Sequence, residues 1–251
     1  MTAPHRTIET DPREVRADLA AAFRWTARLD MHEGVANHFS VALDPEGRRF
    51  LVNPNQMHFA RIRASDLIEV DAGDPETLER PDAPDPTAWG LHGAVHRAVP
   101  RARCVMHVHS PYATALACLE DPTLPPIDQN ACMFFDRVAV DRGYGGLAFE
   151  DEGARCARLL EDPKTTILLM GNHGVLAIGA TVGETFDRLY YFERAAATYL
   201  RALWTGRPLS ILSEAVAETT AQQLEAYPGA GERHLAELRA LLDAEGSDYA
   251  E

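Results

Sequence analysis

Apolar residues recur at helical spacing in several stretches of the chain. Asp11 followed by Pro12 is typical of a helix start, so we expect a first helix over about residues 12–30. A second helix is expected from Thr87 to a point before Pro100, and a third is expected to begin at Ser110, which caps it. Further segments with helical spacing are 150–162, 181–204 and the stretches that follow Ser213 and Gly231.

Other segments have the composition and alternation of strands, at 38–43, 48–53, 66–71, 104–109, 165–170 and 175–179. Turn residues separate 38–43 from 49–52 and 165–170 from 174–178, which predicts two hairpins. The acidic, proline-rich stretch 72–86 is expected to hold neither helix nor strand, and 122–146 is less regular. This pattern favours an antiparallel or mixed sheet flanked by helices.

The composition restricts the class of protein. A chain of 251 residues with 46% hydrophobic residues is expected to form a single domain, 1–251, with a helical extension from about 205. The formal net charge of −14 argues against nucleic acid or an anionic membrane as a partner and favours small molecules. The polar N-terminal segment and the lack of a long apolar run predict a cytoplasmic protein, in which the four scattered cysteines are reduced thiols, mostly buried.

Three histidines are the strongest candidates for chemistry. In the strand CVMHVH, alternation places His107 and His109 on one face, about 6–7 Å apart, from where both imidazoles can reach one ion. His173 follows in a glycine-flanked turn that can present a third ligand. On spacing alone, ordinary hydrogen-bonded histidines remain the alternative.

The segments RARCVMHVHSPYATALACL and LLMGNHGVLAIG carry a paired signature that resembles the class II aldolase/adducin family. Further similar segments are VANHFSVAL, LVNPNQMHFARIRASDLIEVD, WGLHGAVHRAVPRAR and LYYFERAA. The resemblance implies a three-layer α/β/α fold around a mainly antiparallel sheet, usually in a homotetramer. It also implies that His107, His109 and His173 bind a divalent metal ion, with Zn²⁺ as the first choice and Fe²⁺, Mn²⁺ or Co²⁺ as alternatives.

The sequence departs from the aldolases of this family where they place their acid/base glutamate. That position, four residues before His92, is Ala88, which cannot transfer a proton. The serine pair that binds a substrate phosphate is also absent apart from Thr87, and the second phosphate-contacting motif reads Asn37-His38-Phe39-Ser40. These departures are similar to the adducin-like branch and to the non-haem iron oxygenases that act on prenylated 4-hydroxyphenylpyruvate, and they disfavour a phosphorylated sugar as substrate.

Three other residues are candidate proton carriers, namely His38, His58 and Tyr144, on segments expected near the cleft. For each, a surface or structural role is the alternative. His92 and His96 lie one helical turn apart, which would also suit a metal, but family position argues that His92 packs near the site without ligating.

Three hypotheses follow. The first is a metal-dependent lyase, by aldol cleavage or decarboxylation, acting on a small non-phosphorylated 2-oxo or hydroxy acid or ketone. The second is a non-haem iron oxygenase of 2-oxo acids that uses the same ligands. The third is a non-catalytic adducin-like module, which the retention of all three histidines disfavours.

Overall fold

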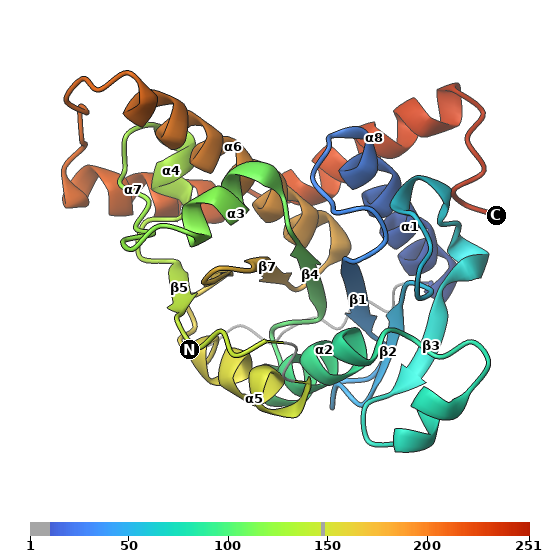
Figure 1. Ribbon diagram of the computed structural model, residues 1–251. Coiled ribbons are helices and arrows are strands. Elements are labelled where there is room, and N and C mark those ends of the chain that lie inside the picture. The colour runs from blue at the N-terminus through green and yellow to red at the C-terminus, as the bar shows by residue number, and fades with distance from the viewer. Residues whose placement is uncertain (1–10, 147–148) are drawn as a thin grey trace, which may run out of the picture.

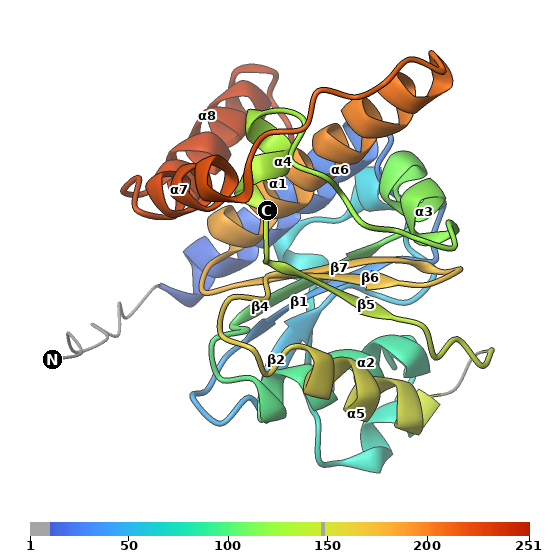
Figure 2. The same cartoon turned by 90° about the vertical axis from the view of Figure 1, so that its left-hand side faces the viewer.

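The computed structural model describes residues 11–146 and 149–251 and shows one sheet between two layers of helices (Figure 1, Figure 2). The seven strands follow the order β3-β2-β1-β4-β7-β6-β5 across the sheet. Their bounds are β1 His38–Ala42, β2 Arg49–Val52, β3 Ile68–Asp71, β4 Cys104–Val108, β5 Val138–Asp141, β6 Ile167–Met170 and β7 Gly174–Gly179. All neighbouring strands run antiparallel except β5 and β6. The expected three-layer α/β/α fold with a mainly antiparallel sheet is therefore confirmed.

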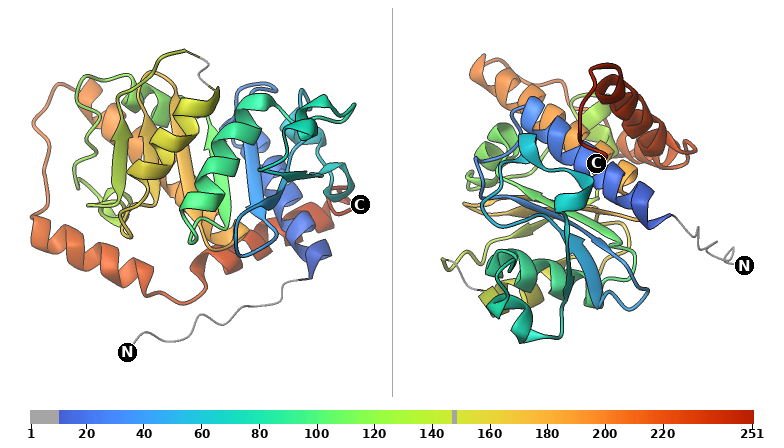
Figure 3. Two further views of the ribbon diagram at one scale, coloured as in Figure 1. Left: turned by 90° about the horizontal axis from the view of Figure 1, so that it is seen from below. Right: turned by 90° about the vertical axis from the view of Figure 1, so that its right-hand side faces the viewer.

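The helices divide unequally between the two faces of the sheet (Figure 2, Figure 3). One face carries α1 Pro12–Arg28, α3 Pro111–Ala117, α4 Gln129–Met133, α6 Val182–Trp204, α7 Glu214–Glu225 and α8 Ala230–Ala244. The opposite face carries α2 Pro86–Ala98 and α5 Phe149–Leu159, which pack against each other. Among the described helices, none is long and apolar enough to cross a membrane.

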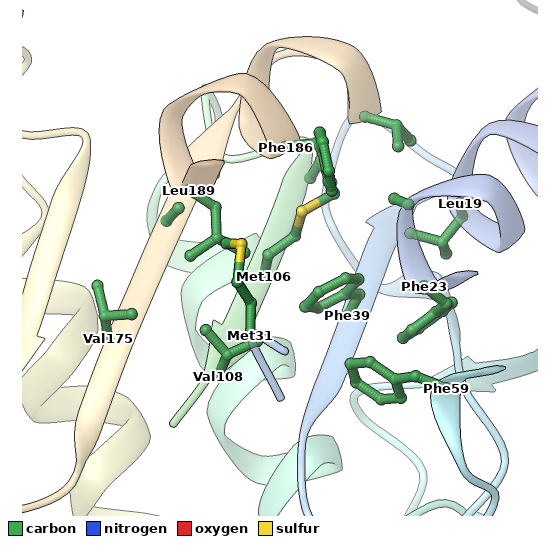
Figure 4. Close-up of a cluster of buried hydrophobic side chains, with 14 of the residues drawn as sticks. Leu19, Phe23, Met31, Phe39, Phe59, Met106, Val108, Val175, Phe186 and Leu189 are labelled. Atoms are coloured by element: carbon green, nitrogen blue, oxygen red, sulfur yellow. The ribbon is translucent and has the colours of Figure 1, made fainter. Parts of the chain in front are cut away.

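Strand alternation divides the core between the two layers. Phe39, Met106 and Val108 point toward α1 and α6, in the larger apolar cluster of Figure 4. Val105 points the other way, into the smaller cluster under α2 and α5. Since His107 shares the parity of Val105, its ring lies on the α2/α5 side of the sheet, as the alternation of CVMHVH predicted.

Both predicted hairpins are confirmed, because β1 pairs with β2 and β6 with β7 in antiparallel register. Two stretches contain more structure than predicted. The region 122–146 contains α4 and β5, and β5 pairs in parallel with β6. No local sequence pattern predicts this pairing. The loop 72–86 contains the short 3-10 helix η3 Pro75–Glu79, because the Asp74 side chain accepts a bond from the Glu76 backbone N–H and Pro75 fits a first helical position.

Ser110 occupies the N-cap position of α3, but the prediction that its side chain caps the helix is wrong. The Ser110 hydroxyl donates instead to Glu193 of α6, and the same carboxylate accepts the Tyr112 and Ala113 backbone N–H groups. A residue from a distant helix therefore provides the cap. Of the four free cysteines, Cys104, Cys132 and Cys156 are buried as expected, whereas Cys118 is exposed.

Candidate metal centre and its neighbouring histidines

The three predicted ligands come together where β4 ends beside the β6–β7 turn. His107 is on β4, His109 follows the end of that strand, and His173 lies in the turn before β7. Because β4 pairs with β7, with His107 opposite Leu176, the turn is held next to the end of β4. Gly174 permits this approach, since a Cβ there would lie 2.5 Å from the Val108 carbonyl oxygen and 2.8 Å from the His109 ring.

The three imidazoles face one another at close range. One ligand nitrogen from each of His107, His109 and His173 lies within 4.8 Å of the other two. The ring centroids are 4.8–5.0 Å apart, and the Nε2 atoms of His107 and His109 are separated by 3.1 Å. Two nitrogens on a tetrahedral ion with bonds of about 2.0–2.1 Å would be about 3.3 Å apart, so this spacing fits a shared cation.

The Nδ1 atom of each ring has an oxygen beside it. His107 Nδ1 donates to the Val175 carbonyl oxygen at 3.1 Å. His109 Nδ1 lies 3.5 Å from a carboxylate oxygen of Glu33. His173 Nδ1 lies 3.6 Å from a carboxylate oxygen of Glu152 and is buried, with no hydrogen-bond partner among the described residues. Metal-binding histidines characteristically direct their second nitrogen to a carbonyl or carboxylate, which leaves Nε2 for the ion.

The electrostatic environment keeps two of these ligands neutral. Burial, followed by repulsion from the neighbouring imidazoles, holds the pKa of His107 well below its usual range. Burial and the proximity of His173 also lower the pKa of His109, although Glu33 opposes the shift. A neutral imidazole keeps the lone pair that a metal ion needs, so both residues fit a divalent cation at pH 7.

His38 is the candidate proton carrier that lies next to this cluster. It is directly opposite His107 in the β1–β4 register, and the two rings are 5.0 Å apart. Its Nδ1 bonds to His92 Nε2 at 2.7 Å, and burial lowers the pKa of His38 to about 4. His92 therefore contacts a neighbour of the ligands and is not a member of the three-histidine cluster.

The other two candidate proton carriers have different surroundings. The Tyr144 side chain is 51% exposed, and its ring lies 5.9 Å from the ring of His173, at the edge of the cluster. Both nitrogens of His58 have partners, because Nδ1 accepts the Ala60 backbone N–H and Nε2 bonds to His32 Nε2 at 3.1 Å. Proton transfer by His58 would require breaking one of these bonds.

Three residues around the centre were missed by the sequence reasoning. Glu33 and Glu152 approach the ligands, but nothing in their local sequence distinguishes them from the other acidic residues of the chain. Asn37 is 2% exposed, and its Oδ1 accepts the backbone N–H groups of Glu33 and, at 3.4 Å, His109. The sequence names Asn37 only as the first residue of the NHFS motif and does not indicate these two bonds. Ala88, where a glutamate was expected, packs in an apolar cluster that also contains Phe50.

The fold and the site define a class of α/β proteins that hold three imidazoles at the end of a central strand. Residues 17–200 match the family model for the Class II Aldolase and Adducin N-terminal domain. This match spans most of the chain, so the protein belongs to the class II aldolase/adducin family.

Two similar proteins come from Streptomyces. The "Decarboxylase NovR" of Streptomyces niveus is 34% identical over 215 residues, which cover 83% of this chain and 76% of that protein. The "4-hydroxy-3-prenylphenylpyruvate oxygenase/4-hydroxy-3-prenylbenzoate synthase" of Streptomyces roseochromogenus is 34% identical over 221 residues, covering 83% and 74%. A solved structure of an aldolase II superfamily protein from Pseudomonas syringae is 28% identical and superimposes with a TM-score of 0.85, covering 98% of each chain.

Proposed function

We propose that the protein is a divalent-metal-dependent lyase that cleaves a carbon–carbon bond of a small, non-phosphorylated 2-oxo or hydroxy acid or ketone. The observation that supports this most strongly is the arrangement of the three ligand rings, in which each Nδ1 lies beside an oxygen. Membership of the aldolase family and the name of the Streptomyces niveus decarboxylase support a lyase as the class of enzyme.

His107, His109 and His173 would hold the ion, with Zn²⁺ as the first choice for a set of three imidazoles. A bound ion of this kind supplies Lewis-acid polarisation of a substrate carbonyl or hydroxyl. Because the described residues contribute three nitrogens to this set, a substrate oxygen can approach the same point.

The protein's own residues would handle the protons. In an aldol cleavage, His38 takes the proton from the substrate hydroxyl while the carbon–carbon bond breaks and that oxygen becomes a carbonyl. The electron pair of the broken bond stays on the other fragment, which receives a proton at carbon from the Tyr144 hydroxyl or from water. Tyr144 is suited to this step because its partly exposed ring lies at the edge of the ligand cluster.

The groups that bind a substrate phosphate in the aldolases are missing from this site, and this bears on the class of substrate. The position of the family's glutamate is occupied by Ala88, in an apolar cluster, and the serines that contact a phosphate are missing. His38 and Ser40 occupy the second phosphate-contacting motif and are themselves bonded to α2 histidines. A carboxylate or ketone therefore fits better than a phosphorylated sugar.

A non-haem iron oxygenase of 2-oxo acids is the second candidate. It is favoured by the name of the Streptomyces roseochromogenus relative and by the same three-nitrogen ligand set. The family also includes adducins, so a non-catalytic module is the third.

One experiment separates these candidates. The protein is purified without a metal-affinity tag, its bound metal is measured, and a panel of 2-oxo and 3-hydroxy acids is tested with and without O₂. Zinc with O₂-independent product release supports the lyase. Bound iron together with O₂ consumption overturns the lyase proposal and supports the oxygenase. A folded protein that takes up neither metal overturns both enzyme proposals and leaves the module.

We also propose an assembly and a location for the protein. We expect one domain with its C-terminal helices docked on it, since α8 packs against α1 and α6. A homo-oligomer, a tetramer by family expectation, would cover the exposed apolar side chains near the α6–α7 connection, namely Leu203, Trp204, Ile211, Leu212 and Val216. Light scattering coupled to gel filtration tests this. The four free cysteines fit a reducing compartment, the cytoplasm.

A further inference from the structure

Behind His38, a continuous chain of hydrogen bonds runs into the protein interior. His38 Nδ1 bonds to His92 Nε2 at 2.7 Å, and His92 Nδ1 bonds to the Ser40 hydroxyl. The same hydroxyl bonds to His96 Nε2 at 2.7 Å, and His96 Nδ1 reaches the Ala102 carbonyl oxygen at 2.7 Å. All four side chains are at most 5% exposed, so water does not compete for these bonds.

Local periodicity explains how two elements build this chain. His38 and Ser40 are two residues apart on β1 and therefore share a face of the sheet. His92 and His96 are four residues apart on α2 and share a face of the helix. Packing α2 on that face of β1 interleaves the two pairs, so the bonds alternate between strand and helix.

The inner end of the chain determines the direction of every bond. The Ala102 carbonyl oxygen can only accept, so His96 Nδ1 carries a proton. Burial lowers the pKa of His96 to about 4, so the ring is neutral at pH 7 and its Nε2 must accept from the Ser40 hydroxyl. The Ser40 oxygen then accepts from His92 Nδ1.

The bond directions at the outer end of the chain are fixed in the same way. Burial holds the pKa of His92 well below its usual range, so its Nε2 is unprotonated and accepts from His38 Nδ1. A neutral His38 with its proton on Nδ1 has a lone pair on Nε2. Among the described residues, no side chain or backbone group forms a hydrogen bond with this nitrogen, and the ring lies 5.0 Å from that of His107.

We infer that Ser40, His92 and His96 are positioning residues that hold His38 in the tautomer protonated on Nδ1, with a basic Nε2 kept free beside the candidate metal centre. The tautomer itself follows from the hydrogen bonds and from the neutrality of the buried rings, and it does not depend on the reaction. Its use as the base for a substrate proton rests on the function proposed above. Without this chain of hydrogen bonds, the neutral His38 ring could carry its proton on either nitrogen. The tautomer with Nε2–H cannot accept a proton at Nε2.

The tautomer can be measured directly in the metal-free, full-length protein. Long-range ¹H–¹⁵N spectra of uniformly labelled protein at pH 7 show which nitrogen of each ring carries hydrogen. Assignments come from the loss of one signal set in His38→Gln, His92→Gln and His96→Gln. We expect protonated Nδ1 and bare Nε2 at all three rings. A wild-type His38 that carries its proton on Nε2 overturns the inference, whatever the variants show.

Ser40 offers a matched pair of variants. Ser40→Ala removes the link, so the Nε2–H tautomer of His38 should become detectable, whereas Ser40→Thr keeps a hydroxyl and should keep the wild-type tautomers. His107 signals and circular dichroism report whether each variant is folded. A folded Ser40→Ala protein with unchanged His38 and His92 tautomers also overturns the inference.

Catalysis provides the second readout, measured on the metal-loaded enzyme with a substrate from the panel. Ser40→Ala should lower kcat by roughly 10–10² fold, part of the usual effect of general base catalysis, with KM and metal content nearly unchanged. Equal kcat in Ser40→Ala and wild type, with the tautomers shifted, would show that His38 is not the base. If the wild type binds no metal and has no activity, the proposed function fails while the tautomer result stands.

Discussion

The buried carboxylate of Glu193 accepts a 2.7 Å hydrogen bond from the Ser110 hydroxyl and, in doing so, ties α6 to the first turn of α3. Two backbone N–H groups of that turn, Tyr112 and Ala113, also donate to it at 2.8 Å. Because His109 directly precedes this turn, Glu193 fixes the segment that carries a metal ligand.

Glu193→Gln should therefore destabilise the fold. The amide group replaces one accepting oxygen by a donor, which leaves a buried N–H or hydroxyl without a partner. We expect a loss of ~1–3 kcal/mol in the free energy of unfolding, measured by urea titration. Glu237→Gln, at an exposed position of α8, is the control and should change stability little. Equal stability of Glu193→Gln and wild type would show that the carboxylate is dispensable.

His109→Ala should abolish metal binding while leaving the fold intact. The residue follows the end of β4 and its side chain is 20% exposed, so its removal breaks no sheet pairing. Metal content after dialysis against Zn²⁺ and far-UV circular dichroism measure the two effects. His234→Ala is the matched control, because His234 bonds to Asp187 outside the ligand cluster. Full metal retention in His109→Ala would refute the ligand assignment.

Glu152→Gln should weaken metal binding without removing a ligand. Glu152 lies 3.6 Å from His173 Nδ1, where a carboxylate can orient the ring, and loss of such a partner typically costs about 10–100 fold in metal affinity. Competition with a chelating dye measures the affinity. Glu161→Gln, at an exposed position just after α5, should bind metal as the wild type does. If Glu152→Gln and Glu161→Gln bind the metal equally well, Glu152 does not orient His173, and its role is limited to the contact with Arg155.

The stability of the metal-free protein should fall at mildly acidic pH, in part because of His96. Its pKa is about 4 in the folded state, against an ordinary value of 6.5 in the unfolded chain, because burial disfavours the charged ring. Between these values the unfolded state binds more protons. Stability is thus unaffected above about pH 6.5 and is lost progressively as the pH falls toward 4.

For one histidine, this shift corresponds to ~3 kcal/mol at the acidic end of the window. His96→Phe removes the titrating group from a site that already packs against Phe50. Urea titrations at intervals between pH 7 and pH 4 should show a shallower decline for His96→Phe than for the wild type. Parallel curves would mean that His96 does not contribute to the pH dependence.

The sequence by itself determined what depends on local periodicity. Alternation along CVMHVH placed His107 with Val105 on one face, and turn residues located both hairpins. Motif positions identified the family and the three histidines that converge in the structure. These features could be read from the chain because spacings of two residues in a strand and about four in a helix fix which side chains share a face.

Only the tertiary structure decided which distant faces meet. The pairing of β5 with β6, the capping of α3 by Glu193, and the approach of Glu33 and Glu152 to the ligands join segments with no mutual signal in the sequence. The same is true of the bond between His38 and His92. Each of these contacts exists because a sheet register or a helix packing places two elements within hydrogen-bond distance, which is a property of the folded chain as a whole and of no single segment.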